Sequence, residues 1–258
     1  MLLAVDVGNT NIVLGIHDGE QWLHHWRVRT VREKMPDEHA VQFRVFLREA
    51  GLAMHAFDQL VLSSVVPPLT TSMQAMLATQ TGLEPLVVSH TVDTGLVFAV
   101  DNPAEVGADL IANAVAAYNY FQGACIIVDF GTATTFTAVS DAATFLGVAI
   151  APGVNLAASA LAGGTAQLPQ IQLVPPPYAI GTNTIYAIQS GVLLGYVALV
   201  QGMIDHFRSE MGVRAPVIAT GGLSRLIPPL TDRFDAVDEW LTLEGIRLIA
   251  LRNRDNGA

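Results

Sequence analysis

Apolar positions along the chain follow two spacings, one typical of strands and one typical of helices. Residues 12–16 form the short apolar run of a buried strand. Residues 36–50 follow helical spacing instead, because Phe43, Phe46 and Leu47 fall on one face. In chain order the first part predicts a strand ending at Asp6, strands at 12–16 and 21–29, a helix at 36–50, a strand at 60–65, a helix to about residue 81, a strand at 85–88 and a helix within 101–120.

The second part of the chain repeats a similar order. Strands mixed with helices in this way indicate an α/β fold with mixed sheets flanked by helices. We expect two domains, residues 1–118 and 119–258, and no low-complexity linker marks the boundary between them near residues 118–123. The predicted elements are strands at 125–130, up to 141 and at 145–151, a helix of small residues after 153, a proline-rich loop or edge at 168–178, a long helix at 184–211, a strand at 217–219, a helix from 223 after the glycine turn at 220–222, and a closing segment at 241–252.

Two of the predicted strand ends carry the same short polar pattern. Residues 5–14 run Val-Asp-Val-Gly-Asn-Thr-Asn-Ile-Val-Leu, and residues 127–139 repeat the order strand, Asp, apolar, Gly, polar run, strand. Glycine lets backbone N–H groups approach and cradle an anion, and the carboxylate can hold a metal ion. Either Asp alone is explained as well by an ordinary turn. The two copies together predict related halves that each present a phosphate loop, although the chain has no Gly-Lys-Ser or Gly-Lys-Thr P-loop.

The charge of the chain limits its partners. The 258 residues are 51% hydrophobic, enough for a substantial core, and carry a formal net charge of −10. Such an acidic chain lacks the basic face that binding to nucleic acid or to an anionic membrane would need. No Lys or Arg lies between Arg48 and Arg208. A phosphate ligand would therefore be neutralised by bound cations, or by arginines that folding or a partner chain brings in.

Targeting signals are also weak. The first residues lack the basic segment and cleavage pattern of a signal peptide, and the single Cys125 cannot form an internal disulfide. We therefore expect a cytoplasmic location. Residues 185–204 are the most membrane-like stretch, but Gln189 and Ser190 interrupt them. We predict a buried helix there, packed on its own domain and on a second subunit, with no membrane partner.

Asp109 has two possible roles at this point. It lies near the start of a predicted helix, where the helix dipole stabilises a carboxylate without any further function. It could instead be a general base, because phosphoryl transfer to an alcohol needs a carboxylate within hydrogen-bond reach of the hydroxyl. The residues around Asp109 leave both roles open.

Six segments, taken together and in this order, resemble the motifs of type III pantothenate kinases. They are residues 6–10 (DVGNT), 102–109 (NPAEVGAD), 129–134 (DFGTAT), 151–153 (APG), 181–184 (GTNT) and 220–222 (TGG). The resemblance implies the duplicated ribonuclease-H-like halves of the actin-like ATPase superfamily, with a nucleotide cleft between them. It also implies ATP-dependent phosphorylation of pantothenate, the first step toward coenzyme A, in a cytoplasmic homodimer.

The same resemblance implies roles for single residues. Asp109 would be the catalytic proton acceptor, Asp6 would help to hold Mg²⁺, and Asp129 would hold a monovalent cation, K⁺ or NH₄⁺. The implied ATP-binding residues are Asp6, Val7, Gly8, Asn9, Thr10, Asn11, Ile12, Val13 and Thr132, and the implied pantothenate-binding residues are Val100, Gly107, Ala108, Asp109, Leu110 and Thr184.

Two positions depart from the family pattern. Leu110 follows Asp109 where the family has an arginine, and Val100 stands where many members have a tyrosine. Loss of a charged hydrogen bond costs about 1.5–3 kcal/mol, or roughly tenfold or more in binding or rate. Leu110 therefore keeps a second hypothesis open, a catalytically weakened nucleotide-binding homologue with a regulatory or accessory role. A third, another kinase or a phosphatase of the same superfamily, is less favoured by the pantothenate-specific motifs.

Overall fold

A computed structural model describes residues 1–254, which form two compact units. One unit contains Met1–Asn119 together with the C-terminal helix from Leu241, and the other contains Tyr120–Trp240. The first division lies next to the expected one at residue 118, but the chain returns to the first unit at its C-terminus. The reason is the apolar face of that helix, whose buried residues pack against strands of the first unit.

The first unit is built on a mixed sheet in the order β3-β2-β1-β4-β5. The strand β1 pairs antiparallel with β2 and parallel with β4. Its strands are β1 (Leu2–Val7), β2 (Asn11–His17), β3 (Trp22–Arg29), β4 (Gln59–Ser64) and β5 (Leu86–Val87), followed in the chain by the short β6 (Val97–Phe98). Its helices are α1 (Pro36–Glu49), α2 (Pro67–Thr81), α3 (Ala108–Phe121) and α7 (Leu241–Arg252).

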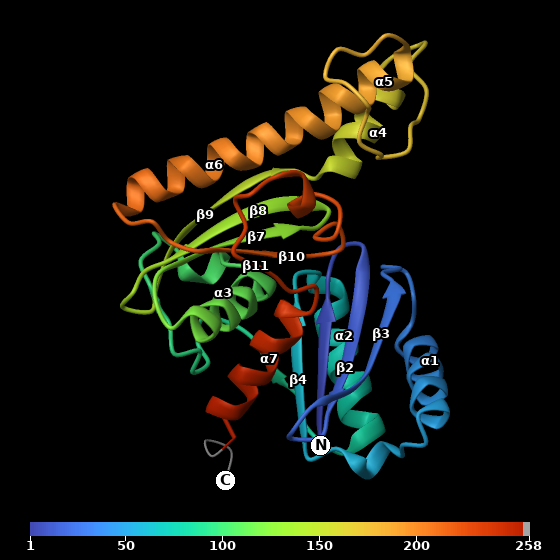
Figure 1. Cartoon of the computed structure of the whole chain (residues 1–258). Helices are drawn as coiled ribbons and strands as arrows, with labels where there is room; N and C mark the ends of the chain where they lie inside the picture. The colour runs from blue at the N-terminus through green and yellow to red at the C-terminus, as the bar shows by residue number, and fades with distance from the viewer. Residues whose placement is uncertain (255–258) are drawn as a thin grey trace. The chain divides into compact units, whose positions relative to one another are not determined.

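Helices cover both faces of this sheet (Figure 1). Alternate residues of the strands, such as Leu60 and Leu62, join a core with α1 and α2. The helix α7 packs on β1 and β4, and Gln59 of β4 donates a hydrogen bond to the carbonyl of Ala250, 2.7 Å away. The central strands β1 and β4 are therefore buried on both faces, as their nearly continuous apolar runs predict.

The second unit repeats the strand arrangement of the first. Its sheet runs β11-β10-β7-β8-β9, with β7 antiparallel to β8 and parallel to β10. Its strands are β7 (Cys125–Phe130), β8 (Ala133–Val139), β9 (Thr144–Pro152), β10 (Val217–Thr220) and β11 (Ala236–Val237). In each sheet the strand that carries the acid, β1 or β7, has the next two strands of the chain on one side and two later strands on the other. This shared order confirms the duplicated halves predicted from Asp6 and Asp129.

A long helical run covers one face of this second sheet (Figure 1). It comprises α5 (Thr184–Gln189), a π-helical turn (Ser190–Leu194) and α6 (Gly195–Met211), and α4 (Val154–Gly164) precedes it. Thr184–Met211 is long and apolar enough to cross a membrane, but half of its apolar window is buried inside the protein, as in the core helix of a globular protein. One face is buried as expected, whereas Ile185, Tyr186 and Leu199 are exposed.

Candidate active site

The first Asp-Gly turn is a tight hairpin between β1 and β2. The N–H of Gly8 donates to the carbonyl of Asn11 at 2.9 Å, which leaves the tip residues Asn9 and Thr10 exposed. Thr30 supports the hairpin from the end of β3, because its hydroxyl donates to the Gly8 carbonyl at 2.7 Å. The predicted phosphate-loop residues 6–13 thus form a tight turn whose tip is exposed.

Asp6 lies at the carboxyl ends of the parallel strands β1 and β4. Its register partner on β4 is Ser63, and the Ser63 hydroxyl donates to Asp6 Oδ1 at 2.8 Å. The chain continues from Ser63 to Val65, whose N–H donates to the carbonyl of Val7 at 3.1 Å. This edge is where open α/β sheets bind their ligands.

The turn that carries Asp109 reaches the same edge. The Cβ of an alanine at position 107 would lie 3.3 Å from Val65 and 2.6 Å from Asp109 Oδ1, so only glycine leaves room for both. Helix α3 begins at Ala108, as the Gly-Ala-Asp step predicts, and Asp109 Oδ1 accepts the N–H of Leu110 at 2.7 Å. Within the first unit the structure therefore brings Gly107 beside Val65, the residue that follows β4 and donates a hydrogen bond to the end of β1.

The environment of Asp109 favours its neutral form. Burial raises the pKa of the Asp109 carboxyl, and the hydrogen bond from the Leu110 N–H only partly opposes this effect. A raised pKa brings a carboxylate closer in basicity to a substrate hydroxyl, which suits proton transfer. Leu110, where the resemblance led us to expect an arginine, is only 8% exposed and belongs to the apolar core.

The second Asp-Gly turn joins β7 to β8 and receives support from a third turn. Asp129 lies in register with Thr220 of β10, directly before Gly221. Gly221 has φ +88°, and a Cβ there would collide with Asp129 Oδ1 and lie 2.8 Å from the backbone nitrogen of Phe130. Thr132 follows at the hairpin tip, where its carbonyl accepts the N–H of Gly153 at 3.1 Å. Three glycine turns far apart in the sequence therefore surround Asp129 and Thr132.

The oxygen atoms at both aspartates fit hard cations. In the second unit, the buried hydroxyl of Thr220 has no hydrogen-bond partner and lies on the strand next to Asp129. A carboxylate with a free hydroxyl oxygen is a donor set that K⁺ or Mg²⁺ accepts. Among residues 1–254 no cluster of three or more His, Cys, Asp or Glu side chains could hold a metal by itself. Mg²⁺ characteristically takes one or two carboxylates and completes its shell with phosphates and water.

Folding also brings an arginine to the first loop, which the local sequence did not reveal. Arg32 Nη2 donates to Asn9 Oδ1 at 3.0 Å, so a guanidinium lies at the hairpin tip. Ser63 at Asp6 and Thr220 at Asp129 were missed in the same way. Each reaches the turn from a neighbouring strand, and the only signal that could have indicated them was a correct strand alignment.

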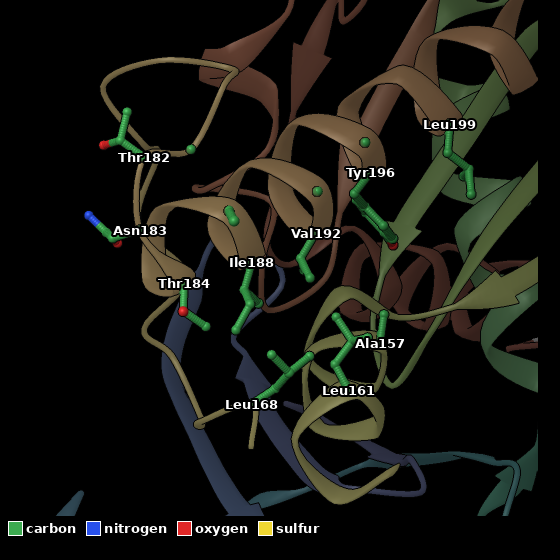
Figure 2. Close-up of a pocket in the computed structure, with 14 residues that line it drawn as sticks. Ala157, Leu161, Leu168, Thr182, Asn183, Thr184, Ile188, Val192, Tyr196 and Leu199 are labelled. Atoms are coloured by element: carbon green, nitrogen blue, oxygen red, sulfur yellow. The ribbon is translucent and has the colours of Figure 1, made fainter. Parts of the chain in front are cut away.

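Thr184, the predicted pantothenate contact of the second unit, lies on the rim of an open groove of about 800 Å³ (Figure 2). It is exposed at the first position of α5, where Asn183 caps the helix by accepting the N–H of Tyr186 at 2.9 Å. The rim is polar and the floor is apolar, formed by side chains of α4 and α6 such as Leu161 and Leu199. Val100, half-buried after β6, belongs to the first unit.

Comparisons with known proteins bear on both the fold and the family. Residues 2–206 match the family model described as type III pantothenate kinase. The chain is 47% identical over 253 residues to a type III pantothenate kinase of Moorella thermoacetica, an alignment that covers 98% of this chain and all of the relative.

Two solved structures share the fold at low identity. A Baf family protein from Campylobacter jejuni superposes with a TM-score of 0.63 at 18% identity, covering 98% of this chain and 99% of the other. MreB 5 of Spiroplasma citri, solved bound to AMPPNP, gives a TM-score of 0.61 at 8% identity, covering 100% and 98%. These likenesses support the expected actin-like ATPase fold. The match of the family model and the full-length identity go further, and the chain belongs to the type III pantothenate kinase family.

Proposed function

We infer that this protein transfers the γ-phosphoryl group of ATP to the primary hydroxyl of pantothenate, the first step of coenzyme A synthesis. Family membership supports this function. The observation that carries it is the partly buried Asp109 carboxyl beside Val65, at the strand edge that also presents the Asp6 loop. Phosphoryl transfer needs this pairing of a base with a phosphate loop, because most of the catalysis is positioning and charge stabilisation.

We propose the following division of roles. Asp109 Oδ accepts the proton of the pantothenate hydroxyl, and its raised pKa favours that transfer. The hairpin of residues 6–13 holds phosphates through its N–H and hydroxyl groups, with the Arg32 guanidinium beside Asn9. Asp6 would hold Mg²⁺, while Asp129 and Thr220 would hold K⁺ or NH₄⁺; when bound, these ions neutralise phosphate charge. Thr132 would contact ATP, and Val100, Gly107, Ala108, Leu110 and Thr184 would contact pantothenate.

The test is ADP release by the purified protein with and without pantothenate, in K⁺ buffer and in Na⁺ buffer. We expect turnover that requires pantothenate and is faster in K⁺. A folded protein that binds ATP but shows no pantothenate-dependent turnover would contradict the function. Equal rates in the two buffers would contradict only the monovalent cation site.

Leu110 supplies a test of the weakened-homologue hypothesis, which the full-length similarity to kinases does not favour. We expect the natural protein to turn over and Leu110→Arg to lower its free energy of unfolding by about 1–3 kcal/mol, since the new guanidinium would enter an apolar core. Leu110→Met, similar in volume, should change little. An inactive natural protein that becomes active as Leu110→Arg would reverse this conclusion. Urea unfolding and the ADP assay measure both effects.

We propose that the second unit forms a homodimer through its exposed apolar side chains. Ile150 of β9, Leu156 of α4 and Leu199 of α6 are exposed by 68%, 54% and 39%. Large apolar side chains left exposed in one chain are typical of subunit interfaces. We expect Leu199→Glu to shift the protein to a monomer in sedimentation, whereas Val41→Glu, at an exposed apolar position of α1, should not. A natural protein that sediments as a monomer would refute the dimer.

We propose a cytoplasmic location, where ATP and K⁺ are abundant. The acidic net charge is the reason that we expect neither nucleic acid nor an anionic membrane as a partner. Cys125 is buried in β7, and burial raises the pKa of its thiol to about 12, so it is an inert part of the core.

A further inference from the structure

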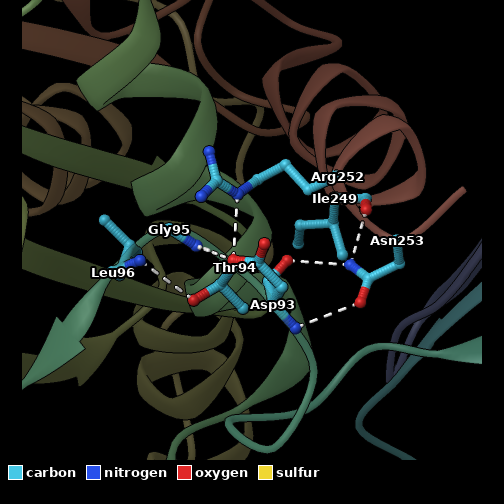
Figure 3. Close-up of polar contacts among 7 residues, drawn as sticks. All are labelled: Asp93, Thr94, Gly95, Leu96, Ile249, Arg252 and Asn253. Atoms are coloured by element: carbon cyan, nitrogen blue, oxygen red, sulfur yellow. Dashed lines mark hydrogen bonds and ion pairs between the residues drawn. The ribbon is translucent and has the colours of Figure 1, made fainter. Parts of the chain in front are cut away.

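Residues at the end of helix α7 form hydrogen bonds with a short segment of the first unit, residues 93–96 (Figure 3). The side-chain amide of Asn253 pairs with the backbone of Asp93: its Oδ1 accepts the Asp93 N–H at 3.1 Å, and its Nδ2 donates to the Asp93 carbonyl at 2.8 Å. The same Nδ2 donates to the carbonyl of Ile249 at 2.8 Å, which ties the segment to the last turn of α7. The Asn253 side chain thus satisfies both the N–H and the carbonyl of Asp93, as the backbone of a neighbouring strand would.

Arg252 binds the same segment through an ion pair with the Asp93 side chain. Its Nε donates to Asp93 Oδ1 at 3.0 Å, and that oxygen also accepts the N–H of Gly95 at 3.0 Å. Gly95 has φ +73°, and a Cβ there would lie 2.7 Å from the guanidinium carbon of Arg252. The guanidinium therefore covers a turn that only glycine can form.

The other half of α7 is fixed to α3, the helix that begins at Ala108. A Cβ at Gly245 would overlap the carbonyl of Ala112, so the two helix backbones are in direct contact. Thr242 donates to Asn113 Oδ1 at 2.8 Å, and Asn113 is fully buried. Helix α7 therefore connects the first turns of α3 with the segment 93–96.

The two regions that α7 connects lead along the chain to the proposed pantothenate residues. The segment 93–96 leads through β6 to Val100, and α3 carries Asp109 and Leu110. We propose that Arg252 and Asn253 are positioning residues for pantothenate: they hold the segment 93–100 in place relative to the start of α3. This proposal rests on the proposed function. It concerns a helix beyond residues 2–206, the range that the family model matches.

The test replaces Asn253 with alanine and measures pantothenate and ATP kinetics separately. Removing three hydrogen bonds should free the segment, so we expect the KM for pantothenate to rise about fivefold to tenfold. The KM for ATP and the kcat should change less than about twofold, because the Asp6 loop and Asp109 keep their own supports. Asn253→Asp keeps the acceptor for the Asp93 N–H and loses both donated bonds, so it should show an intermediate effect and serves if the alanine variant fails to fold.

Two further variants separate positioning from general damage. Arg252→Ala should raise the KM for pantothenate by about twofold, because its ion pair with Asp93 is nearly half exposed. Arg254→Ala removes an arginine from the same end of α7, 4.0 Å from Asp58 and without contact to segment 93–96, and should leave both KM values unchanged. Equal changes in the two KM values for Asn253→Ala, or none, would overturn the proposal.

Hydrogen exchange tests the same idea without any turnover. In the natural protein the amide hydrogens of Asp93 and Gly95 should exchange slowly, and in Asn253→Ala they should exchange at least about tenfold faster. Unchanged exchange would overturn the positioning role whatever the kinetics. If the natural protein has no pantothenate-dependent activity but exchange responds, the proposed function fails and the mechanical link remains.

Discussion

The Asp109→Asn variant is expected to lose about 10²–10⁴-fold in kcat and to unfold less readily than the natural protein at neutral pH. The loss follows because a positioned general base contributes about that factor, and asparagine cannot accept the proton. Asparagine can still accept the Leu110 N–H, so the turn should persist. Steady-state ADP release measures the first effect, and the KM for ATP should be nearly unchanged.

The gain in stability follows from the direction of the pKa shift. Burial raises the pKa of Asp109 in the folded protein above its unfolded value, so folding favours the protonated form. The stability from this group is complete at a pH below the unfolded pKa and is lost as the pH rises through the folded pKa. A neutral asparagine escapes this loss, so the difference between the variants should shrink as the pH falls toward 4.

Urea unfolding at several pH values checks this expectation. Asp232→Asn, at an exposed carboxylate of the second unit, is the control for the loss of one carboxylate and should leave activity unchanged. An Asp109→Asn protein with full activity would exclude Asp109 as the base. One that is less stable than the natural protein at every pH would show that the carboxylate is held by favourable contacts instead.

The Gly221→Ala variant is the second change with a large expected effect, because it disturbs Asp129 directly. Residue 221 has φ +88°, which costs a non-glycine residue about 1–3 kcal/mol. Its new Cβ would also overlap Asp129 Oδ1 and press on the backbone of Phe130. We expect stability to fall by about 2–4 kcal/mol and Asp129 to move, with loss of any K⁺ dependence of the rate.

The neighbouring glycine supplies a matched control. A Cβ at Gly222 would meet nothing within 4 Å, so Gly222→Ala should stay within about 0.5 kcal/mol of the natural protein. Thermal unfolding and ADP release in K⁺ and Na⁺ buffers distinguish the two variants. If Gly221→Ala kept its stability and its K⁺ response, then the third glycine turn would not support Asp129.

Much of the fold was predictable because its signals are local. The strands around residues 12–16 and 125–130, the helix at 36–50 and the long helix from residue 184 follow from apolar spacing and are confirmed. The short strands β6 and β11 escaped prediction because two residues carry no periodicity. The helix expected from residue 223 was wrong, because the chain forms turns there and a short 3-10 helix at Pro228–Leu230, where two prolines limit further helix. The placement of α7 with the first unit also escaped, since its apolar face could cover either sheet until the partner surfaces existed.

The candidate site divides in the same way. The Asp-Gly turns at Asp6 and Asp129 stand out because glycine and short polar residues break an apolar run. The residues that folding places around those turns carry no comparable signal in the local sequence. The roles of Asp109, Thr132, Val100 and Thr184 stay predictions until ligands or variants test them.

By itself the sequence determined two copies of a strand that ends in an acid and a glycine, because backbone geometry and strand spacing act between neighbours. Only the tertiary structure decided what meets those acids: Ser63 at Asp6, 57 positions away, and Gly221 at Asp129. It also decided that Asn253 would hold Asp93 from 160 positions away. Contacts over such separations depend on which surfaces pack together, and no short stretch of residues contains that information.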